Sequence, residues 1–413
     1  MKLTKYILLG GLGLLSLASC KKDFLDVTPT ENLSNKDAEA TEPGIVGLVN
    51  GLHNMMYMYN FGQVFSYGFP SMNVQLDMLG DDVINTKPAY HMAVYRWQDH
   101  RDRTDTDKNL TYKAWDGYYK LILHANKAIA GYRTILPEEE RKHVATRYAY
   151  GEALAIRAYA YHQLVQLFAK RYRAATAATD LGVILRTDKD QSKQFEPMAR
   201  STVAETYKQI EEDLKESLDV LKGLEQATDR NRLRYSTVCG IAARVALCKE
   251  DWAAAEDYAT KAIQQSNSRL AKGEELIDGF NNYKAPEWMW GYHQSDTQDT
   301  GWGSFSIAYS YNVSGHNKSL RYAINRDIYD QLGSGDVRRK WWVCLDRGDQ
   351  VPKDAYSVYF AMNGDVPQWE ITGQCIKFRS KAQGSTFMDL VMMRVAEMYY
   401  IKAEAEARQG KEA

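Results

Sequence analysis

The 413-residue sequence lacks an excess of either charge. Lysine and arginine total 52 and aspartate and glutamate total 53, which gives a formal net charge of −1. A protein that binds nucleic acid through its phosphates needs clustered positive charge, so this composition argues against that class. With 45% hydrophobic and 25% charged residues, the chain has the composition of a protein that buries a core, which excludes disorder over most of its length.

Cysteine is scarce, with five residues in the whole chain. No CxxC pair and no cluster of histidine and cysteine has the spacing of metal ligands, so the sequence predicts neither a metal site nor a cofactor. Cys239 and Cys248 are nine positions apart on a predicted helix, on opposite sides, and cannot pair with each other. Cys344 and Cys375 lie in loop- and strand-like sequence, where one disulfide or two free thiols are equally compatible with an oxidising compartment.

Long apolar runs are also missing after the first twenty residues, so no membrane-spanning helix is expected there. The N-terminus itself has Lys2 and Lys5, an apolar run over residues 6–18, and small residues before Cys20. This pattern is typical of a bacterial lipoprotein signal, and a plain secretory signal or a buried N-terminal helix is the alternative. We therefore expect a signal peptide over residues 1–19, lipidation at Cys20, and an extended tether over residues 20–36. Lys21 after the cysteine resembles lipoproteins sent to the outer membrane.

Helical periodicity dominates residues 37–270. Apolar residues recur at spacings of three, four and seven over residues 112–135, 152–169, 201–221, 235–249 and 252–265. The segment 242–262 has small residues where two helices of a hairpin must approach closely, and it resembles a tetratricopeptide unit. Such pairs stack because neither can bury its apolar face alone. The predicted fold is mainly α, a tetratricopeptide-like scaffold of helical hairpins.

Residues 271–386 have a different character, rich in glycine, asparagine, serine and tyrosine, with short strand-like runs at 287–292 and 376–378. Long irregular regions of this kind are usually functional or disordered, and the tryptophan and tyrosine content of this one favours an ordered, functional region. The predicted organisation is therefore a helical scaffold over 37–270, a loop-rich ligand-binding region over 271–386, and a C-terminal helix over 387–413, whose pattern starts near residue 386.

Several sequence blocks together resemble the SusD/RagB family of outer-membrane glycan-binding lipoproteins of the Bacteroidetes. They occur in the family's order across nearly the whole chain: residues 19–26, Trp115 with Tyr118, Tyr119, Ile122, Asn126 and Ile129, residues 152–164, residues 336–339 and residues 394–405. Members of the family normally continue beyond the position that ends near Gln409 here, so a truncated chain is expected. Within the blocks, Arg157, Arg394 and Glu397 are interpreted as residues that hold helix against helix, with arginine satisfied by a buried glutamate, rather than as a catalytic pair.

A sugar ring has an apolar face and a rim of hydroxyls, so it binds an aromatic surface flanked by hydrogen-bonding side chains. From the resemblance we expect Trp97, Trp302, Tyr309 and Tyr311 to contribute to such a surface, with Asp82 as a polar neighbour. For each single ring a place in the core is an equally good interpretation.

Three related expectations concern neighbouring residues. Trp341 and Trp342 form a second candidate pair for the ligand surface. Trp288 and Trp290 alternate in a predicted strand, so at least one should be buried. Asp81 and Asp82 either bind Ca²⁺ or cap a turn, and the turn is favoured.

The family resemblance implies a non-catalytic lipoprotein that captures oligosaccharides, or in some members peptides, and passes them to a SusC-type TonB-dependent transporter. A helical-repeat scaffold that binds only protein is the main alternative. A glycoside hydrolase is the other, but it needs two carboxylates at a defined separation and the sequence contains no recognisable pair.

Overall fold

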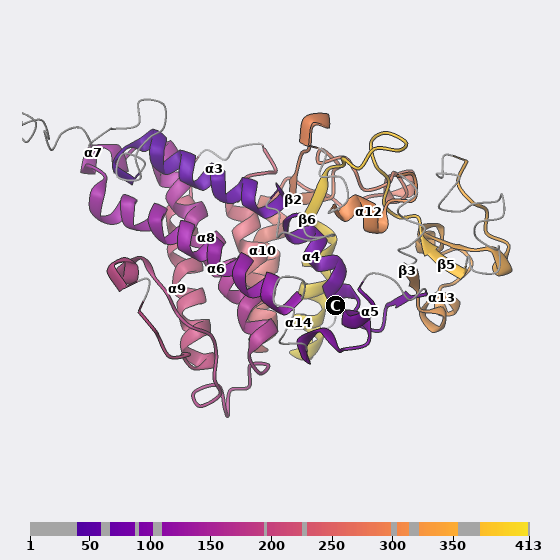
Figure 1. The fold of residues 1–413 in the computed structure, drawn as a ribbon, viewed down its shortest axis with the longest axis horizontal. Coiled ribbons are helices and arrows are strands. Elements are labelled where there is room, and N and C mark those ends of the chain that lie inside the picture. Colours follow the sequence, from indigo (N-terminus) through magenta and orange to yellow (C-terminus); the bar gives the residue numbers. More distant parts are fainter. Residues whose placement is uncertain are drawn as a thin grey trace, which may run out of the picture.

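A computed structural model of the chain describes residues 39–58, 67–86, 91–101, 110–193, 196–224, 229–298, 304–313, 322–353 and 372–411. Figure 1 shows an elongated molecule, with the long helices gathered in one half and the small sheet of β3 and β5 near the other end. The prediction of a mainly α fold is confirmed. Within the described ranges, no helix is both long enough and apolar enough to cross a membrane.

Helix α8 (Val144–Phe168) is the centre of the helical half. Its residues from Thr146 to Val165 are almost all buried, as expected for a helix that is surrounded by others. Its packing partners include α3 (Glu42–Met58), α6 (Leu110–Ala130) and α9 (Val203–Leu221). Thr202 caps the start of α9: its side chain and that of Glu205 form a capping box that satisfies the first backbone N–H groups.

The predicted hairpin consists of α10 (Tyr235–Lys249) and α11 (Trp252–Gln265). Glu250 turns the chain in the left-handed conformation, and the Asp251 side chain accepts a hydrogen bond from the Ala254 backbone N–H. Ala255, Ala259 and Ala262 are fully buried, so the small residues do allow close approach of the helices. Helix α14 (Val395–Arg408) packs against α11 and α10.

Two small antiparallel sheets lie beyond the scaffold. One has the strand order β1-β3-β5-β4, formed by Val83–Asn85, Tyr322–Ile324, Thr372–Cys375 and Trp342–Cys344. The other pairs β2 (Trp288–Tyr292) with β6 (Leu390–Arg394) through an irregular register. The expectation that the last helix starts near residue 386 is wrong, because residues 390–394 pair with β2 and the helix begins only at Val395.

Both Trp288 and Trp290 are buried, which goes further than the prediction that at least one would be. All five residues of β2 are buried, so neither face of this strand meets water. Cys344 and Cys375 lie on adjacent strands and are not bonded to each other. Of the two alternatives, one disulfide or two free thiols, the described structure has two free thiols.

Shorter helical segments connect the main elements. They are α4 (Gly68–Asp77), α5 (Met92–Tyr95), η2 (Asp99–Arg101), η3 (Gly131–Ile135), α7 (Glu138–Arg141), η4 (Asp188–Lys193), η5 (Gly273–Leu276), η6 (Asp296–Gln298), α12 (Phe305–Tyr309), α13 (Arg326–Gln331), η9 (Val337–Trp341) and η10 (Leu345–Arg347).

Candidate functional site

A groove of about 520 Å³ lies beside the four-stranded sheet. We call it the sheet groove. It combines aromatic, aliphatic and charged side chains from segments more than 200 residues apart in the sequence. The lining residues are Leu76, Asp77, Gly80, Asp82, Val83, Ile324, Ile328, Leu332, Arg338, Trp341 and Trp342.

The sheet explains how these segments meet. Val83 of β1 is paired with Ile324 of β3, and Trp342 of β4 with Cys375 of β5, so the four strands form one continuous surface. Asp82 comes directly before β1, at one edge of this sheet, whereas Trp342 opens β4 at the other edge. Helix α13 then supplies Ile328 to the groove, with Leu332 following directly after it.

The two carboxylates of the groove come from the end of α4 and from the turn between α4 and β1. Asp77 ends α4 and accepts a hydrogen bond of 2.9 Å from the Tyr309 hydroxyl. The Asp82 side chain is exposed, and within the described residues it has no hydrogen-bond partner. The backbone carbonyls of Asp81 and Asp82 accept hydrogen bonds from Asn325, which ties this turn to the start of α13. No group of three or more potential metal-ligating side chains occurs in the described part of the chain.

Trp341 and Trp342 form the aromatic part of the groove, and both are half-buried. The Trp341 indole N–H donates a hydrogen bond of 2.6 Å to the Leu276 carbonyl, which fixes the ring. The Trp342 indole N–H has no acceptor among the described residues. One ring is thus anchored, while the other offers a free donor beside an apolar face, the combination that a sugar ring requires.

The remaining charge in the groove is largely balanced. Arg338 binds the carboxylate of Asp336 through Nε and Nη2, at distances between 2.6 and 3.1 Å. This guanidinium lowers the pKa of Asp336 to about 2. Asp77 and Asp82 therefore leave the groove with negative character, which suits sugar hydroxyls as hydrogen-bond donors.

Two of the predicted ligand rings are not exposed. Tyr309 and Tyr311 are only 5% and 8% accessible, so the expectation of an open aromatic surface at these positions is wrong. Tyr309 is enclosed by the rings of Phe305, Tyr322 and Phe378, with centroid separations of 5.4 to 5.7 Å. Its one link to the sheet groove among the described residues is the hydrogen bond that its hydroxyl donates to Asp77.

Of the other two predicted ligand rings, the structure describes only Trp97. Trp97 is 55% exposed, but it borders a separate cavity of about 200 Å³ with Leu79 and Phe168. Trp302 lies outside the described residues. A ligand role for Trp97, Trp302, Tyr309, Tyr311 and Asp82 stays a prediction. Of the four that the structure describes, only Asp82 lines the sheet groove.

Sequence reasoning missed Asp77 as a neighbour of the paired tryptophans and missed the role of Arg338 at the groove. Arg338 stood in one of the family blocks, immediately before the second candidate pair, and this proximity was the available signal. Nothing in the order of residues along the chain indicated that the turn after α4 would meet η9.

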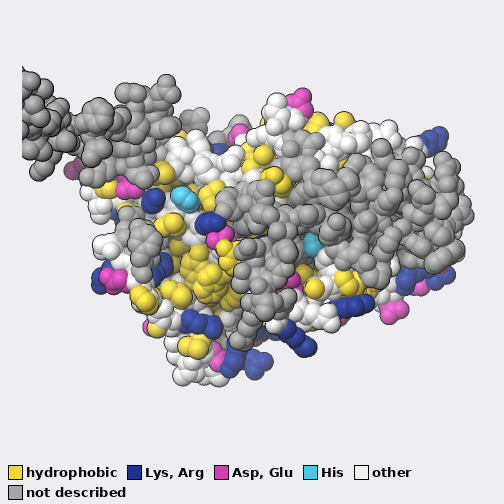
Figure 2. All heavy atoms as spheres, in the orientation of Figure 1, with side chains coloured by type: hydrophobic (Ala, Val, Ile, Leu, Met, Phe, Trp, Pro, Cys, Tyr) yellow, Lys and Arg dark blue, Asp and Glu magenta, His cyan; other side chains and the backbone are white. Residues whose placement is uncertain are grey.

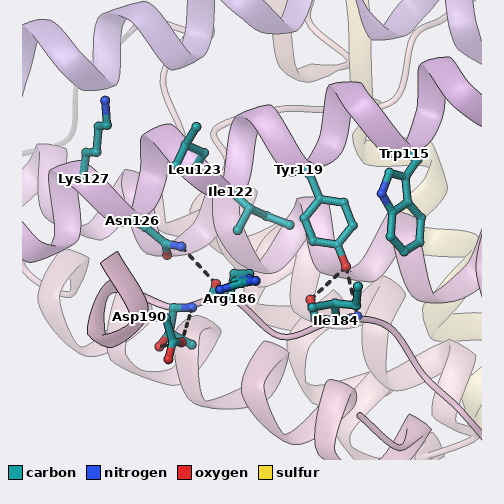
Figure 3. A pocket seen from close by; sticks show the side chains of 10 residues that line it. Trp115, Tyr119, Ile122, Leu123, Asn126, Lys127, Ile184, Arg186 and Asp190 are labelled. Atoms are coloured by element: carbon teal, nitrogen blue, oxygen red, sulfur yellow. Dashed lines mark hydrogen bonds between the residues drawn. The ribbon is translucent and has the colours of Figure 1, made fainter. Parts of the chain in front are cut away.

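Another cavity, of about 280 Å³, lies between α6 and the segment that leads into η4 (Figure 3). We call it the α6 cavity. Its apolar wall consists of Trp115, Tyr119, Ile122 and Leu123 on α6. Figure 2 shows hydrophobic side chains gathered on this face of the molecule.

The polar side chains of the α6 cavity mostly form hydrogen bonds with the backbone (Figure 3). The Tyr119 hydroxyl donates to the Ile184 carbonyl and accepts from the Ile184 N–H, and the Asn126 amide donates to the Arg186 carbonyl. These bonds fasten the backbone of Ile184 and Arg186 to α6.

The arginines and the glutamate of the family blocks hold elements together. Arg157 binds Asp213 and Asp188, rather than the glutamate expected as its partner. Arg394 does bind a buried glutamate, Glu287, at 2.6 Å. Glu397 binds Arg244, also at 2.6 Å, which joins α14 to α10.

Comparison with known proteins identifies the family. Residues 23–247, more than half of the chain, match the SusD-like family model described as "Starch-binding associating with outer membrane". The chain belongs to the SusD-like family. No curated protein sequence matches it.

Solved structures of this SusD-like fold agree over most of the chain. A SusD-like carbohydrate-binding protein from Bacteroides vulgatus has 21% identity and a TM-score of 0.72, and the alignment covers 90% of this chain and 72% of that one. A laminarin-binding SusD-like protein has 18% identity and a TM-score of 0.67, with coverage of 91% and 82%. For a surface glycan-binding protein A from Bacteroides fluxus, the values are 16%, 0.60, 90% and 78%. Identities this low establish the shared fold alone.

Proposed function

We propose that this SusD-like chain is a non-catalytic, lipid-anchored cell-surface protein that captures oligosaccharides and delivers them to a SusC-type TonB-dependent transporter. The observation that carries the proposal is the sheet groove, where the half-buried indoles of Trp341 and Trp342 lie with the carboxylates of Asp77 and Asp82. Family membership and the glycan-binding names of structural relatives support it.

The charge of the groove favours neutral glycans. Asp77 and Asp82 are carboxylates, and the one arginine in the lining is already bound to Asp336. A neutral sugar can donate its hydroxyls to these carboxylates, whereas a uronic acid would meet like charge. Soluble starch and laminarin are therefore expected to bind more tightly than polygalacturonate.

The test measures affinity for these three polysaccharides in wild type, Trp342→Ala and Asp82→Asn. Stacking of a nucleobase on an aromatic ring contributes about 1–3 kcal/mol, and we take the stacking of a sugar ring on an indole to be of similar size or weaker, so Trp342→Ala should weaken binding roughly tenfold. Tyr112→Ala is the control, because Tyr112 is a 43% exposed ring on α6 that does not line the groove. Unchanged affinity in both groove variants, with the melting temperature preserved, would place the ligand elsewhere.

A hydrolase is the second candidate because the groove contains two carboxylates, the residue type that glycoside hydrolases pair across the scissile bond. Its test is the appearance of new reducing ends when the protein is incubated with the same polysaccharides. Binding without hydrolysis is the expected result. Hydrolysis that disappears in both Asp77→Asn and Asp82→Asn would instead establish an enzyme.

A further inference from the structure

Lys377 lies in a cage of three aromatic rings next to the sheet groove. Its ammonium nitrogen is 4.3 Å from the centre of the Trp341 ring, 4.8 Å from Phe280 and 5.3 Å from Phe378. All three distances are within the range in which an aromatic face attracts a cation. The rings come from separate segments, so this one side chain joins the loop before β2, the end of η9 and the segment after β5.

The rings are the closest partners of this ammonium. Within the described residues Lys377 forms no ion pair or hydrogen bond through its side chain. The charged and titratable groups around it are Asp77, Glu287, Arg394 and the Cys375 thiol. Glu287 is bound to Arg394 and Asp77 to the Tyr309 hydroxyl, so both carboxylates already have nearer partners.

The same cage determines where Trp341 can lie. The indole N–H is bonded to Leu276, and the edge of Phe280 approaches the ring at 82° with the centroids 5.9 Å apart. Lys377 adds an attraction to the ring face. A ring held in this way keeps its place in the wall of the groove without needing a ligand to order it.

We propose that Lys377 is a positioning residue for glycan binding: its protonated ammonium, caged by Trp341, Phe280 and Phe378, holds the Trp341 indole in the wall of the sheet groove. The proposal rests on the proposed function, since it assigns a role in that same groove. It adds a dependence of binding on the charge of one lysine that does not itself line the groove.

The charge of Lys377 is adjustable near neutral pH. Enclosure among the rings, together with the positive charge of Arg394, lowers the pKa of Lys377 to about 8. The lysine is therefore protonated below this value and neutral above it. Because only the charged form is attracted to the ring face, affinity should be full at pH 7 and should weaken as the pH rises to 9.

The first test reads the ring without any glycan. The full-length protein is labelled with 5-fluorotryptophan, and the ¹⁹F resonance of Trp341 is assigned with Trp341→Phe. In wild type this resonance should shift with a midpoint near pH 8. It should not shift over this range in Lys377→Met, which carries no charge, or in Lys377→Arg, which stays charged. A Trp341 resonance that is flat in wild type, or that titrates equally in Lys377→Met, would overturn the proposal.

The second test measures affinity for soluble starch and laminarin at pH 7 and pH 9. An attraction of this kind corresponds to about a twofold to tenfold change in affinity, so Lys377→Met should be weaker than wild type at pH 7 by that factor. Lys377→Arg should bind equally well at both pH values, while wild type weakens at pH 9. The melting temperature of each variant is measured on the same samples.

The two hypotheses fail in different ways. If Trp342→Ala and Asp82→Asn bind normally, the groove is not the glycan site, although the fluorine titration can still show that Lys377 holds Trp341. If those variants lose binding while wild type binds equally at pH 7 and pH 9 and Lys377→Met binds like wild type, the site is correct and Lys377 has no positioning role.

Discussion

Arg157 is a fully buried arginine whose charge is compensated within the helical scaffold. It donates to both carboxylate oxygens of Asp213, at 2.7 and 2.8 Å, and to Asp188 and the Asn126 side-chain oxygen, each at 2.8 Å. Burial acts to raise the pKa of Asp188, but the guanidiniums of Arg157 and Arg133 outweigh it and hold that pKa below its usual value. The group joins α6, α8, α9 and η4.

Removal of Arg157 alone should destabilise the folded protein much more than removal of Arg157 and Asp213 together. Arg157→Met leaves the Asp213 carboxylate buried without its cation, and such a loss typically costs about 3–5 kcal/mol. In the double variant Arg157→Met, Asp213→Leu, the uncompensated charge is gone and Asp188 keeps Arg133 at 2.9 Å. Urea unfolding should therefore show the double variant to be more stable than Arg157→Met.

The control is Lys142→Ala, which removes an exposed pair with Glu139. Pairs of this kind contribute about 0–1 kcal/mol, so the unfolding midpoint should hardly move. A double variant less stable than the single one would show that these residues are not coupled through charge.

The burial of His162 is expected to make the stability of the folded protein sensitive to acid. Burial, followed by the charge of Arg244, lowers the pKa of His162 to about 3, so this histidine is neutral in the folded protein. Below about pH 6.5 the unfolded chain binds a proton here that the folded chain does not. Stability should therefore fall as the pH decreases from about 6.5 towards 3, by up to about 1.4 kcal/mol per pH unit from this one group.

His162→Leu removes the ionisable group and should make the decrease of melting temperature between pH 6.5 and 4 shallower. His91, which is also held neutral with a pKa of about 3, still contributes in this variant. An identical slope in wild type and His162→Leu would contradict the assignment.

At the scale of elements, the α10–α11 hairpin depends on small side chains at the helix contact. Ala255 is fully buried on α11, whereas Ala253 on the same helix is exposed. Ala255→Trp must force the helices apart or distort the side chains around it, and overpacking of this kind typically costs about 1–3 kcal/mol. The melting temperature should fall clearly.

Ala253→Trp is the matched control, because the same ring on the exposed face displaces nothing. Equal melting temperatures for the two variants would count against close packing in this hairpin. The two variants can also be compared in a pull-down with the proposed transporter. Loss of capture by Ala253→Trp alone would indicate that the exposed face of α11 docks the partner.

For the whole molecule, attachment to the membrane is predicted from the N-terminal sequence. Cys20 lies outside the described residues, so this expectation rests on the pattern of Lys2, Lys5, the apolar run and the small residues before the cysteine. Cys20→Ala should move the protein from the membrane fraction to the soluble fraction, because lipid chains are what would hold it there.

Cys248→Ala is the control for this experiment. Cys248 is a half-buried free thiol on α10, and its removal should leave the distribution between fractions unchanged. Continued membrane attachment of Cys20→Ala would mean that the protein is held by something other than a lipid on Cys20.

Much of the helical scaffold could be predicted from the sequence because local periodicity decides it. The apolar spacing in α9 and α11 repeats every three to four residues, which marks one face of each helix for burial against neighbouring helices. The small residues of the hairpin are an equally local signal. Local patterns of this kind are readable without any knowledge of distant segments.

Only the tertiary structure decided which residues share the sheet groove and which rings are exposed. Tyr309 has glycine- and serine-rich neighbours that indicate a solvated loop, yet Tyr322 and Phe378 enclose it. Asp82 and Trp341 are about 260 positions apart and meet through the pairing of four short strands. The sequence by itself determined the helices, because their hydrogen bonds are local, whereas burial and the groove depend on contacts between distant segments that form only when the chain folds.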